Sequence, residues 1–96
     1  MSTATFDSQV IAKKHKETYE NITTLVISNY GNNVLWVTIR GVKRPVPPAD
    51  NSLGTAVPVA PFVIESYGHG FTIEVLVEFN GGIGNAIIDT IKIKEC

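Results

Sequence analysis

The amino-acid sequence predicts an all-β fold, an antiparallel β-sandwich preceded by an N-terminal arm or short helix. From Ile22 onward, apolar and polar residues alternate with a period of two, the period at which strand side chains change face. Polar turn segments recur at intervals of about eight to twelve residues, as in small all-β domains. Because consecutive strands are usually neighbours, two packed antiparallel sheets are the expected arrangement.

The size and composition of the chain limit the classes of function. Ninety-six residues form one domain with a modest core, and a hydrophobic fraction of 44% with 18% charged residues favours a globular chain over a disordered one. Eight Lys and Arg against nine Asp and Glu give a net charge of −1, so the basic surface of a nucleic-acid-binding protein is missing. We expect neither a membrane span nor a secretion signal, because no apolar run has the length or flanks of either.

The first 21 residues are predicted to form an arm that is distinct from a β-sandwich domain at residues 22–96. Residues 7–20 are mostly polar, and Val10, Ile11 and Tyr19 lie on a thin helical stripe. An isolated helix of this length would be marginal in water. We therefore expect a short helix or an extended strap that lies against its own domain or against a neighbouring subunit.

The first two strands of the body are predicted to form an antiparallel hairpin. Ile22–Asn29 and Val34–Val42 both alternate with period two, and the Tyr-Gly-Asn-Asn segment between them is typical of a turn. Prolines break the pattern over residues 43–53. Pro58 and Pro61 reduce residues 55–65 to an edge strand or two short pieces, because proline cannot donate a ladder hydrogen bond.

The clearest strand is Phe71–Phe79, in which one face is entirely apolar. A glycine-rich loop over residues 80–85 is predicted to close a hairpin with the last strand, Ala86–Lys94. We expect cross-strand pairs between the lysines of the last strand and the glutamates of the strand before it: Lys92 and Lys94 with Glu74 and Glu78.

No catalytic, cofactor or metal site is expected, and the chain is predicted not to be an enzyme. The single cysteine, Cys96, excludes an intramolecular disulfide and a cysteine-rich zinc site. His15 and His69 are the only histidines, and neither has two or three further ligands near it in the sequence. A triad of Ser66, His69 and Asp89 exists only on paper, because Ser66 is not in a Gly-x-Ser-x-Gly elbow.

Candidate interaction residues come from the arm, the aromatic positions and the turns. Trp36 and Arg40 share one predicted strand face, which either packs inside a second sheet or forms an exposed contact patch. The proline-rich segment after Arg44 either blunts an edge strand or docks a partner. The full set of candidates is Val10, Ile11, Tyr19, Tyr30, Trp36, Arg40, Arg44, Tyr67 and His69.

Four segments resemble small Ig-like or jelly-roll-like accessory proteins of tailed-bacteriophage virions: TLVISNYGNN at residues 24–33, VLWVTIRGV at 34–42, PFVI at 61–64 and GFTIEV at 70–75. The resemblance implies a capsid decoration, head-fibre or tail-associated protein that is made in the host-cell cytoplasm and ends in the virion. Its partners would be other copies of itself, a major capsid protein or a tail protein. Apart from the resemblance, the arm, the proline-rich segment and the lack of a recognisable active site already predict a structural or assembly protein that packs against its neighbours through the arm and the strand edges. The resemblance itself adds no site and carries over no functional residues.

The alternative function is a small β-sandwich module that binds carbohydrate or peptide. It would use Trp36 together with the loop tyrosines Tyr30 and Tyr67, because loop aromatics at one end of a sandwich are a common binding surface.

Overall fold

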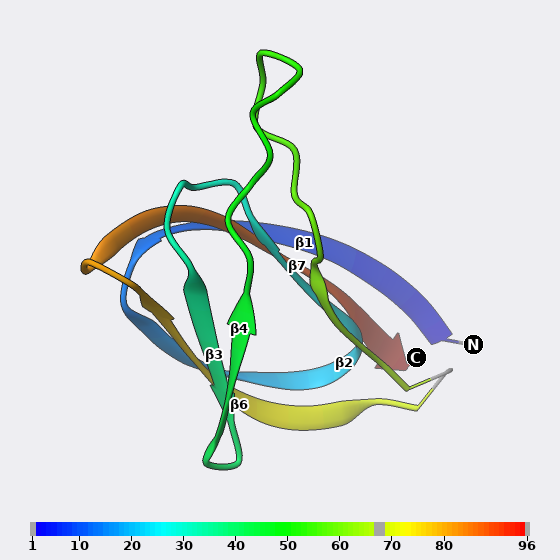
Figure 1. The fold of residues 1–96 in the computed structure, drawn as a ribbon. Helices are drawn as coiled ribbons and strands as arrows, with labels where there is room; N and C mark the ends of the chain where they lie inside the picture. Colours follow the sequence, from blue (N-terminus) through cyan, green and yellow to red (C-terminus); the bar gives the residue numbers. More distant parts are fainter. Residues whose placement is uncertain (1, 67–68, 96) are drawn as a thin grey trace.

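The computed structural model describes residues 2–66 and 69–95, and all regular structure in these residues is β-strand (Figure 1). The all-β prediction is confirmed, whereas the N-terminal short helix is not seen. All strand pairs are antiparallel. The strands are β1 (Ser2–Lys13), β2 (His15–Asn29), β3 (Leu35–Ile39), β4 (Val42–Val46), β5 (Phe62–Glu65), β6 (Phe71–Phe79) and β7 (Ile83–Glu95).

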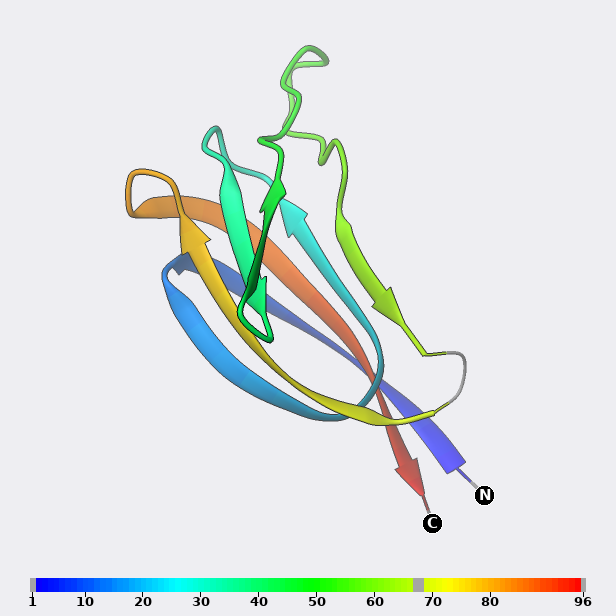
Figure 2. The same ribbon diagram turned by 60° about the horizontal axis from the view of Figure 1, so that its bottom comes forward.

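The strands form one strongly curved sheet in the order β1-β7-β2-β6-β3-β4, with β5 paired to β2 (Figure 2). The long strand β2 changes partners along its length. Its first part, His15–Tyr19, pairs with β6, and its second part, Ile22–Asn29, pairs with β7 and β5. Between these parts the register shifts, and Asn21 has a φ of 54°, a left-handed conformation that asparagine tolerates. The sheet therefore turns through β2.

The predicted N-terminal arm lies within this sheet. β1 pairs with β7 from Ser2 to Lys13, so the arm is an extended segment that lies against its own chain. Two features explain why this segment is a strand and not a helix. Its side chains alternate between the faces of the sheet, with Gln9 and Ile11 pointing inward and Val10 outward. Its backbone groups form hydrogen bonds along β7. The division at residues 21 and 22, which falls inside β2, stays a prediction.

The predicted hairpin between Ile22–Asn29 and Val34–Val42 is wrong. These segments do not pair in the described residues, and β3 pairs instead with β4 and β6. Arg40 and Gly41, with φ values of 50° and 77°, reverse the chain between β3 and β4. Two successive residues with positive φ are typical of a tight hairpin turn, so the expected single strand is divided in two. Proline is tolerated in β4 because β4 is an edge strand.

The predicted hairpin between Phe71–Phe79 and the last strand is also wrong, because β2 lies between β6 and β7. The expected cross-strand positions therefore do not arise: Lys92 and Lys94 lie opposite Thr5 and Thr3 of β1. The Glu74 carboxylate instead lies 3.5 Å from the Lys16 Nζ on β2. The glycine-rich loop crosses from one part of the sheet to another.

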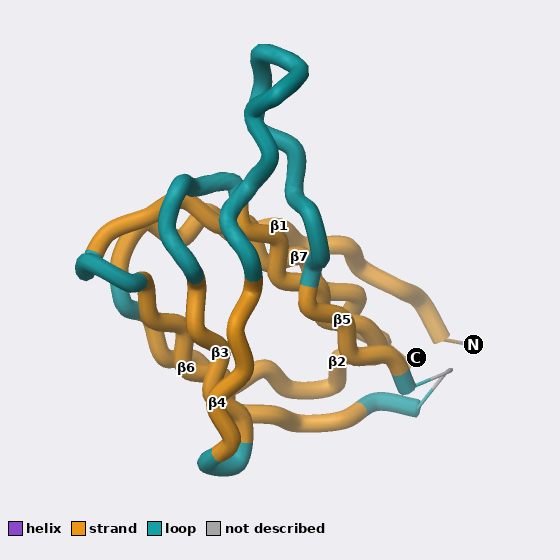
Figure 3. Tube along the Cα trace, viewed as in Figure 1, coloured by secondary structure: helices purple, strands orange, loops and turns teal. Residues whose placement is uncertain are grey.

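Residues 47–61 form a loop that stands away from the sheet (Figure 3). Within the predicted edge strand at residues 55–65, only β5 is regular structure, and it pairs with β2. The two sides of the loop are joined by backbone hydrogen bonds between Asp50 and Val57, at 2.8 and 2.9 Å. The Ser52 backbone N–H donates to the Asp50 carboxylate at 2.9 Å and holds the pKa of Asp50 below its usual value. The loop is thus braced internally.

A single apolar cluster fills the concave side of the curved sheet and takes buried side chains from every strand except β5, whose Phe62 and Ile64 are partly buried against it. Its members come from both parts of β2, so the core holds the two halves of the sheet together. The buried members are Ile11, Tyr19, Ile22, Leu25, Ile27, Leu35, Val37, Ile39, Val46, Val75, Val77, Phe79, Ala86 and Ile88.

Gly84 packs against the ring of Phe79 at one end of this core. A Cβ atom at Gly84 would lie less than 3.0 Å from three ring carbons of Phe79. We expect Gly84→Ala to lower the free energy of unfolding by about 1–3 kcal/mol, measured by urea denaturation, because the added methyl overpacks the site. Adding Phe79→Leu should reduce the penalty of Gly84→Ala, and an undiminished penalty would contradict this explanation. Gly70→Ala is the control, since its Cβ would meet only ordinary contacts.

Candidate interaction surfaces and polar pocket

The predicted patch around Trp36 is divided by the hairpin turn. Trp36 is half-buried on β3, and the Lys43 Nζ of β4 lies 5.1 Å from the centre of its ring. Arg40 is exposed in the turn itself, beyond the end of β3. The Arg44 guanidinium lies 5.8 Å from the centre of the Phe62 ring, so it links β4 to β5. These cations cover aromatic rings and brace neighbouring strands.

Two further turn residues of the predicted set, Tyr30 and His69, make hydrogen bonds with residues other than Trp36. Tyr30 is half-buried after β2, and its backbone N–H donates to the Asn85 carbonyl at 2.8 Å. His69 is exposed, and its carbonyl accepts a hydrogen bond from the Ser66 hydroxyl. Tyr67 lies outside the described residues. Neither of these hydrogen bonds joins a turn residue to Trp36.

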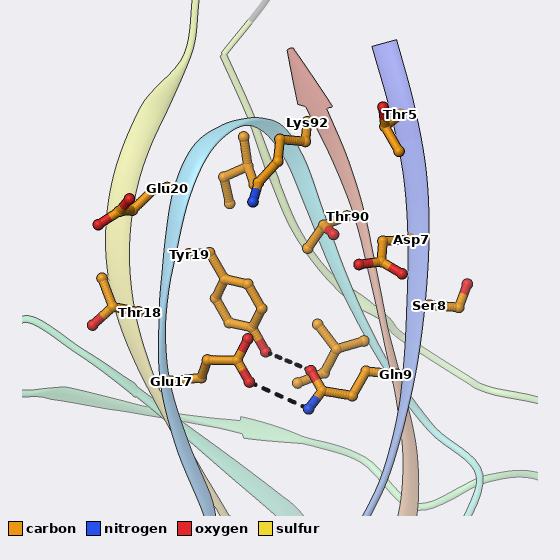
Figure 4. Close-up of a pocket in the computed structure, with 12 residues that line it drawn as sticks. Thr5, Asp7, Ser8, Gln9, Glu17, Thr18, Tyr19, Glu20, Thr90 and Lys92 are labelled. Atoms are coloured by element: carbon orange, nitrogen blue, oxygen red, sulfur yellow. Dashed lines mark hydrogen bonds between the residues drawn. The ribbon is translucent and has the colours of Figure 1, made fainter. Parts of the chain in front are cut away.

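A polar pocket of about 190 Å³ opens between β1, β7 and the first part of β2 (Figure 4). Gln9 connects the hydrogen bonds in this pocket. The Gln9 Nε2 donates to Glu17 Oε1 at 3.2 Å, and the Gln9 Oε1 accepts from the Tyr19 hydroxyl at 3.2 Å. His15 Nε2 lies 2.8 Å from the same Glu17 oxygen. The residues lining the pocket are Thr5, Asp7, Ser8, Gln9, Glu17, Thr18, Tyr19, Glu20, Ile22, Ile88, Thr90 and Lys92.

The pocket network joins two strands that are not neighbours in the sheet. Gln9 is on β1, whereas Glu17 and Tyr19 are on the part of β2 that pairs with β6. Its hydrogen bonds therefore cross the concave side of the sheet and hold β1 over β2. Among the described residues, no group of three or more His, Cys, Asp or Glu is placed to hold a metal ion. Gln9 and Glu17 were not predicted from the sequence, although Thr5, Asp7 and Gln9 are polar residues at alternate positions of β1 and so share one face.

Tyr19 gives this network a dependence on pH. Burial, and secondly the negative charge of Glu17, raises the pKa of Tyr19 to about 12. An unfolded chain ionises tyrosine near pH 10, so the stabilisation from neutral Tyr19 is complete below pH 10 and is lost as the pH rises through about 12.

Tyr19→Phe is expected to remove this part of the alkaline destabilisation. Between pH 10 and 12 the wild type should lose roughly 1–2 kcal/mol more than the variant, measured as the free energy of unfolding in urea. Tyr30→Phe, which removes a phenolic hydroxyl outside this network, is the control. Parallel curves for the wild type and Tyr19→Phe would contradict the assignment.

The convex side of the sheet carries an apolar surface, which we name the outer apolar face. Its apolar members are Phe6, Val10, Val26, Val63, Ile87 and Ile91, and the Ser8–Asp89 pair lies between the Phe6–Ile91 and Val10–Ile87 pairs. Register places Phe6 beside Ile91 and Val10 beside Ile87. Phe6 and Val10 are 66% and 71% exposed. Ser8 lines the edge of the pocket, but its side chain points away from it (Figure 4), and its hydroxyl donates to Asp89 at 2.6 Å on the convex side.

The two ends of the sheet differ in their capacity to pair with another strand. β4 is five residues long, and it carries Lys43, Arg44 and Pro45, which are features that block edge pairing. β1 spans 12 residues without proline, and its register on β7 is regular from Ser2 to Ile11. Its outer edge is open in the sheet order. β1 is therefore the edge that is suited to pairing.

The protruding loop at residues 47–61 carries a second group of exposed apolar side chains. Leu53 is 81% exposed, Val59 59% and Val57 40%. Backbone and side-chain hydrogen bonds fix its base to the turn after β2, from the Ala49 N–H to the Gly31 carbonyl at 2.9 Å and from Asn51 to Asn32 at 3.2 Å. The loop thus presents apolar side chains on a braced support.

Comparisons with protein-family models, with curated proteins and with solved structures give no match for this chain. None of the described residues belongs to a helix long and apolar enough to cross a membrane. The function of the chain is therefore inferred from the surfaces described above.

Proposed function

We propose that this chain is a non-enzymatic structural protein that assembles with neighbouring subunits through its exposed apolar surfaces. One observation carries the proposal: large apolar side chains lie exposed on the outer apolar face and on the protruding loop. Contiguous exposed apolar patches on soluble proteins commonly mark interaction sites. The exposed large hydrophobic residues are Phe6, Val10, Val42, Leu53, Val57, Val59, Val63 and Ile83.

We further propose that the chain assembles into a virion, where it is a capsid decoration or tail-associated subunit. The resemblance of its strand segments to phage accessory proteins supports this assignment. The corresponding fold is an Ig-like or jelly-roll-like sandwich, with β1, β7, β5 and the second part of β2 in one layer and the remaining strands in the other. The change of partners along β2 and the single core support that division.

The alternative of a carbohydrate- or peptide-binding module has less support. It depends on an accessible Trp36 with loop tyrosines around it. Trp36 is half-buried, and Lys43 lies over its ring. The assembly proposal accounts for more of the exposed apolar surface.

Electron microscopy of the native source material, with an antibody against the protein, tests the proposal directly. The expected result is regular labelling of one kind of particle. Labelling of free protein alone, together with a monomeric mass in light scattering at all concentrations, would overturn it.

The protruding loop provides a variant for the same test. Leu53→Asp is expected to reduce incorporation into the particle at least tenfold, while its free energy of unfolding stays within about 0.5 kcal/mol of wild type because the side chain contributes little to the core. Thr55→Asp is the matched control, since it adds the same charge at an exposed polar position of the loop. Equal incorporation of Leu53→Asp and wild type would exclude the loop as a contact.

A further inference from the structure

The open edge of β1 has a pattern that matches itself. Its outward-facing side chains include Phe6, Ser8 and Val10, and its inward-facing ones include Asp7 and Gln9. In an antiparallel pair of identical strands about a two-fold axis normal to the sheet, directly opposite residues share a face. The numbers of two opposite residues therefore add up to an even number, so the two-fold axis must pass through a residue of β1. Only a few registers remain to be compared.

One register places complementary side chains opposite each other. With the axis at Ser8, Phe6 faces Val10 of the second copy and Asp7 faces Gln9. Aromatic residues opposite β-branched ones are favourable cross-strand pairs. This register joins the two most exposed apolar side chains of β1 and uses the stretch over which β1 is regular.

The neighbouring registers are poorer. An axis at Asp7 places two carboxylates directly opposite each other, which is destabilising. An axis at Gln9 places Phe6 opposite Ala12, beside the irregularity that follows Ile11. An axis at Phe6 places Val10 opposite Ser2, at the end of the strand.

We propose that two copies of this chain pair antiparallel through β1 about a two-fold axis at Ser8. The inference rests on the proposed function and names a second copy as a partner. Backbone hydrogen bonds between the edges join the two sheets into one in the order β7-β1-β1-β7. The outer apolar faces of the copies then merge across the axis, with Phe6 and Val10 at the centre of the joint surface.

Disulfide cross-linking of the full chain tests the axis. In a Cys96→Ser background, Ser8→Cys is expected to form a covalent dimer with copper-phenanthroline as the oxidant and to release it on reduction. Directly opposite residues have Cα atoms about 4.5–5.5 Å apart, within the range that a disulfide spans. Phe6→Cys and Val10→Cys should each give less than one-tenth of that yield alone and should cross-link efficiently when mixed.

The outcomes separate this inference from the proposed function. Self-cross-linking of Asp7→Cys in place of Ser8→Cys would overturn the register. A dimer in light scattering that does not cross-link at these sites, or a β1 edge paired with a different protein, would overturn the self-pairing and leave assembly intact. A monomer with no labelled particle in electron microscopy would overturn both.

A charge on the edge gives a second readout without cysteine. Val10→Lys is expected to weaken the dimer at least tenfold in analytical ultracentrifugation, because a lysine on an edge strand opposes pairing. Leu53→Lys, which adds the same charge on the protruding loop, should leave the dimer unchanged. Equal dimerisation of Val10→Lys and wild type would overturn the pairing of β1.

Discussion

A protein made of residues 22–96 is expected to be unfolded. Removing residues 1–21 deletes β1 and the first part of β2, leaving one edge of β7 and one edge of β6 without a partner. It also removes Ile11 and Tyr19 from the core. The loss should exceed about 5 kcal/mol, which is comparable with the whole stability of a small domain.

Circular dichroism and cooperative urea unfolding would measure this effect. A chain that begins at Ala4 is the control, because it loses only three residues and keeps the pairing of Ala4–Ile11 with β7, so it should unfold with nearly wild-type stability. A cooperatively folded 22–96 fragment would instead establish the predicted division into an arm and a domain.

Asn29 is the site of the second large effect. Its side chain is 1% exposed, and its Nδ2 donates to the carbonyls of Asn33, Val46 and Pro47 at 2.8, 3.3 and 3.1 Å. Its Oδ1 accepts from the Gly31 N–H at 2.9 Å. One amide thus ties the end of β2 to the turn that follows it and to the end of β4.

Asn29→Ala is expected to lower the free energy of unfolding by about 2–4 kcal/mol, because it leaves buried backbone groups without partners. Asn29→Asp should be worse at neutral pH, since a carboxylate cannot donate and would face three carbonyl oxygens. Its stability should recover partly in acid, when the carboxyl is protonated.

Urea denaturation at pH 7 and pH 4 would measure both Asn29 variants. Asn33→Ala is the control, because its side chain makes one exposed hydrogen bond of 3.4 Å. A loss below 0.5 kcal/mol for Asn29→Ala would show that water replaces the amide.

The sequence predicted which residues are extended better than it predicted how the strands pair. The alternation in Ile22–Asn29 and Phe71–Phe79 is local, and both segments are strands. Pairing depends on turns and on distant partners. Arg40-Gly41 is a weaker turn signal than Asn-Gly, so the β3–β4 hairpin was missed and the wrong neighbours were joined.

The candidate surfaces show the same limit. Val10 was chosen from a helical stripe, and it is exposed on the same face as Phe6 only because β1 is a strand. The hydrogen bond between Gln9 and Glu17 forms because the curved sheet brings β1 over β2. No periodic pattern in the sequence predicts this curvature. Asn29 was predicted only as the last residue of a strand. The burial of its side-chain amide depends on the three carbonyl groups around it, which the sequence pattern does not reveal.

The pairing of β1 with β7 has a consequence for the order of folding. Residues 2–13 find their partner at residues 83–95, so almost the whole chain must leave the ribosome before this ladder can form. Contacts between distant segments slow folding, and we expect milliseconds to seconds rather than microseconds. During translation β1 has no partner on either edge. Two nascent chains on the same messenger RNA would therefore pair through their β1 strands. Early chaperone binding to residues 2–13 would keep this strand available for β7.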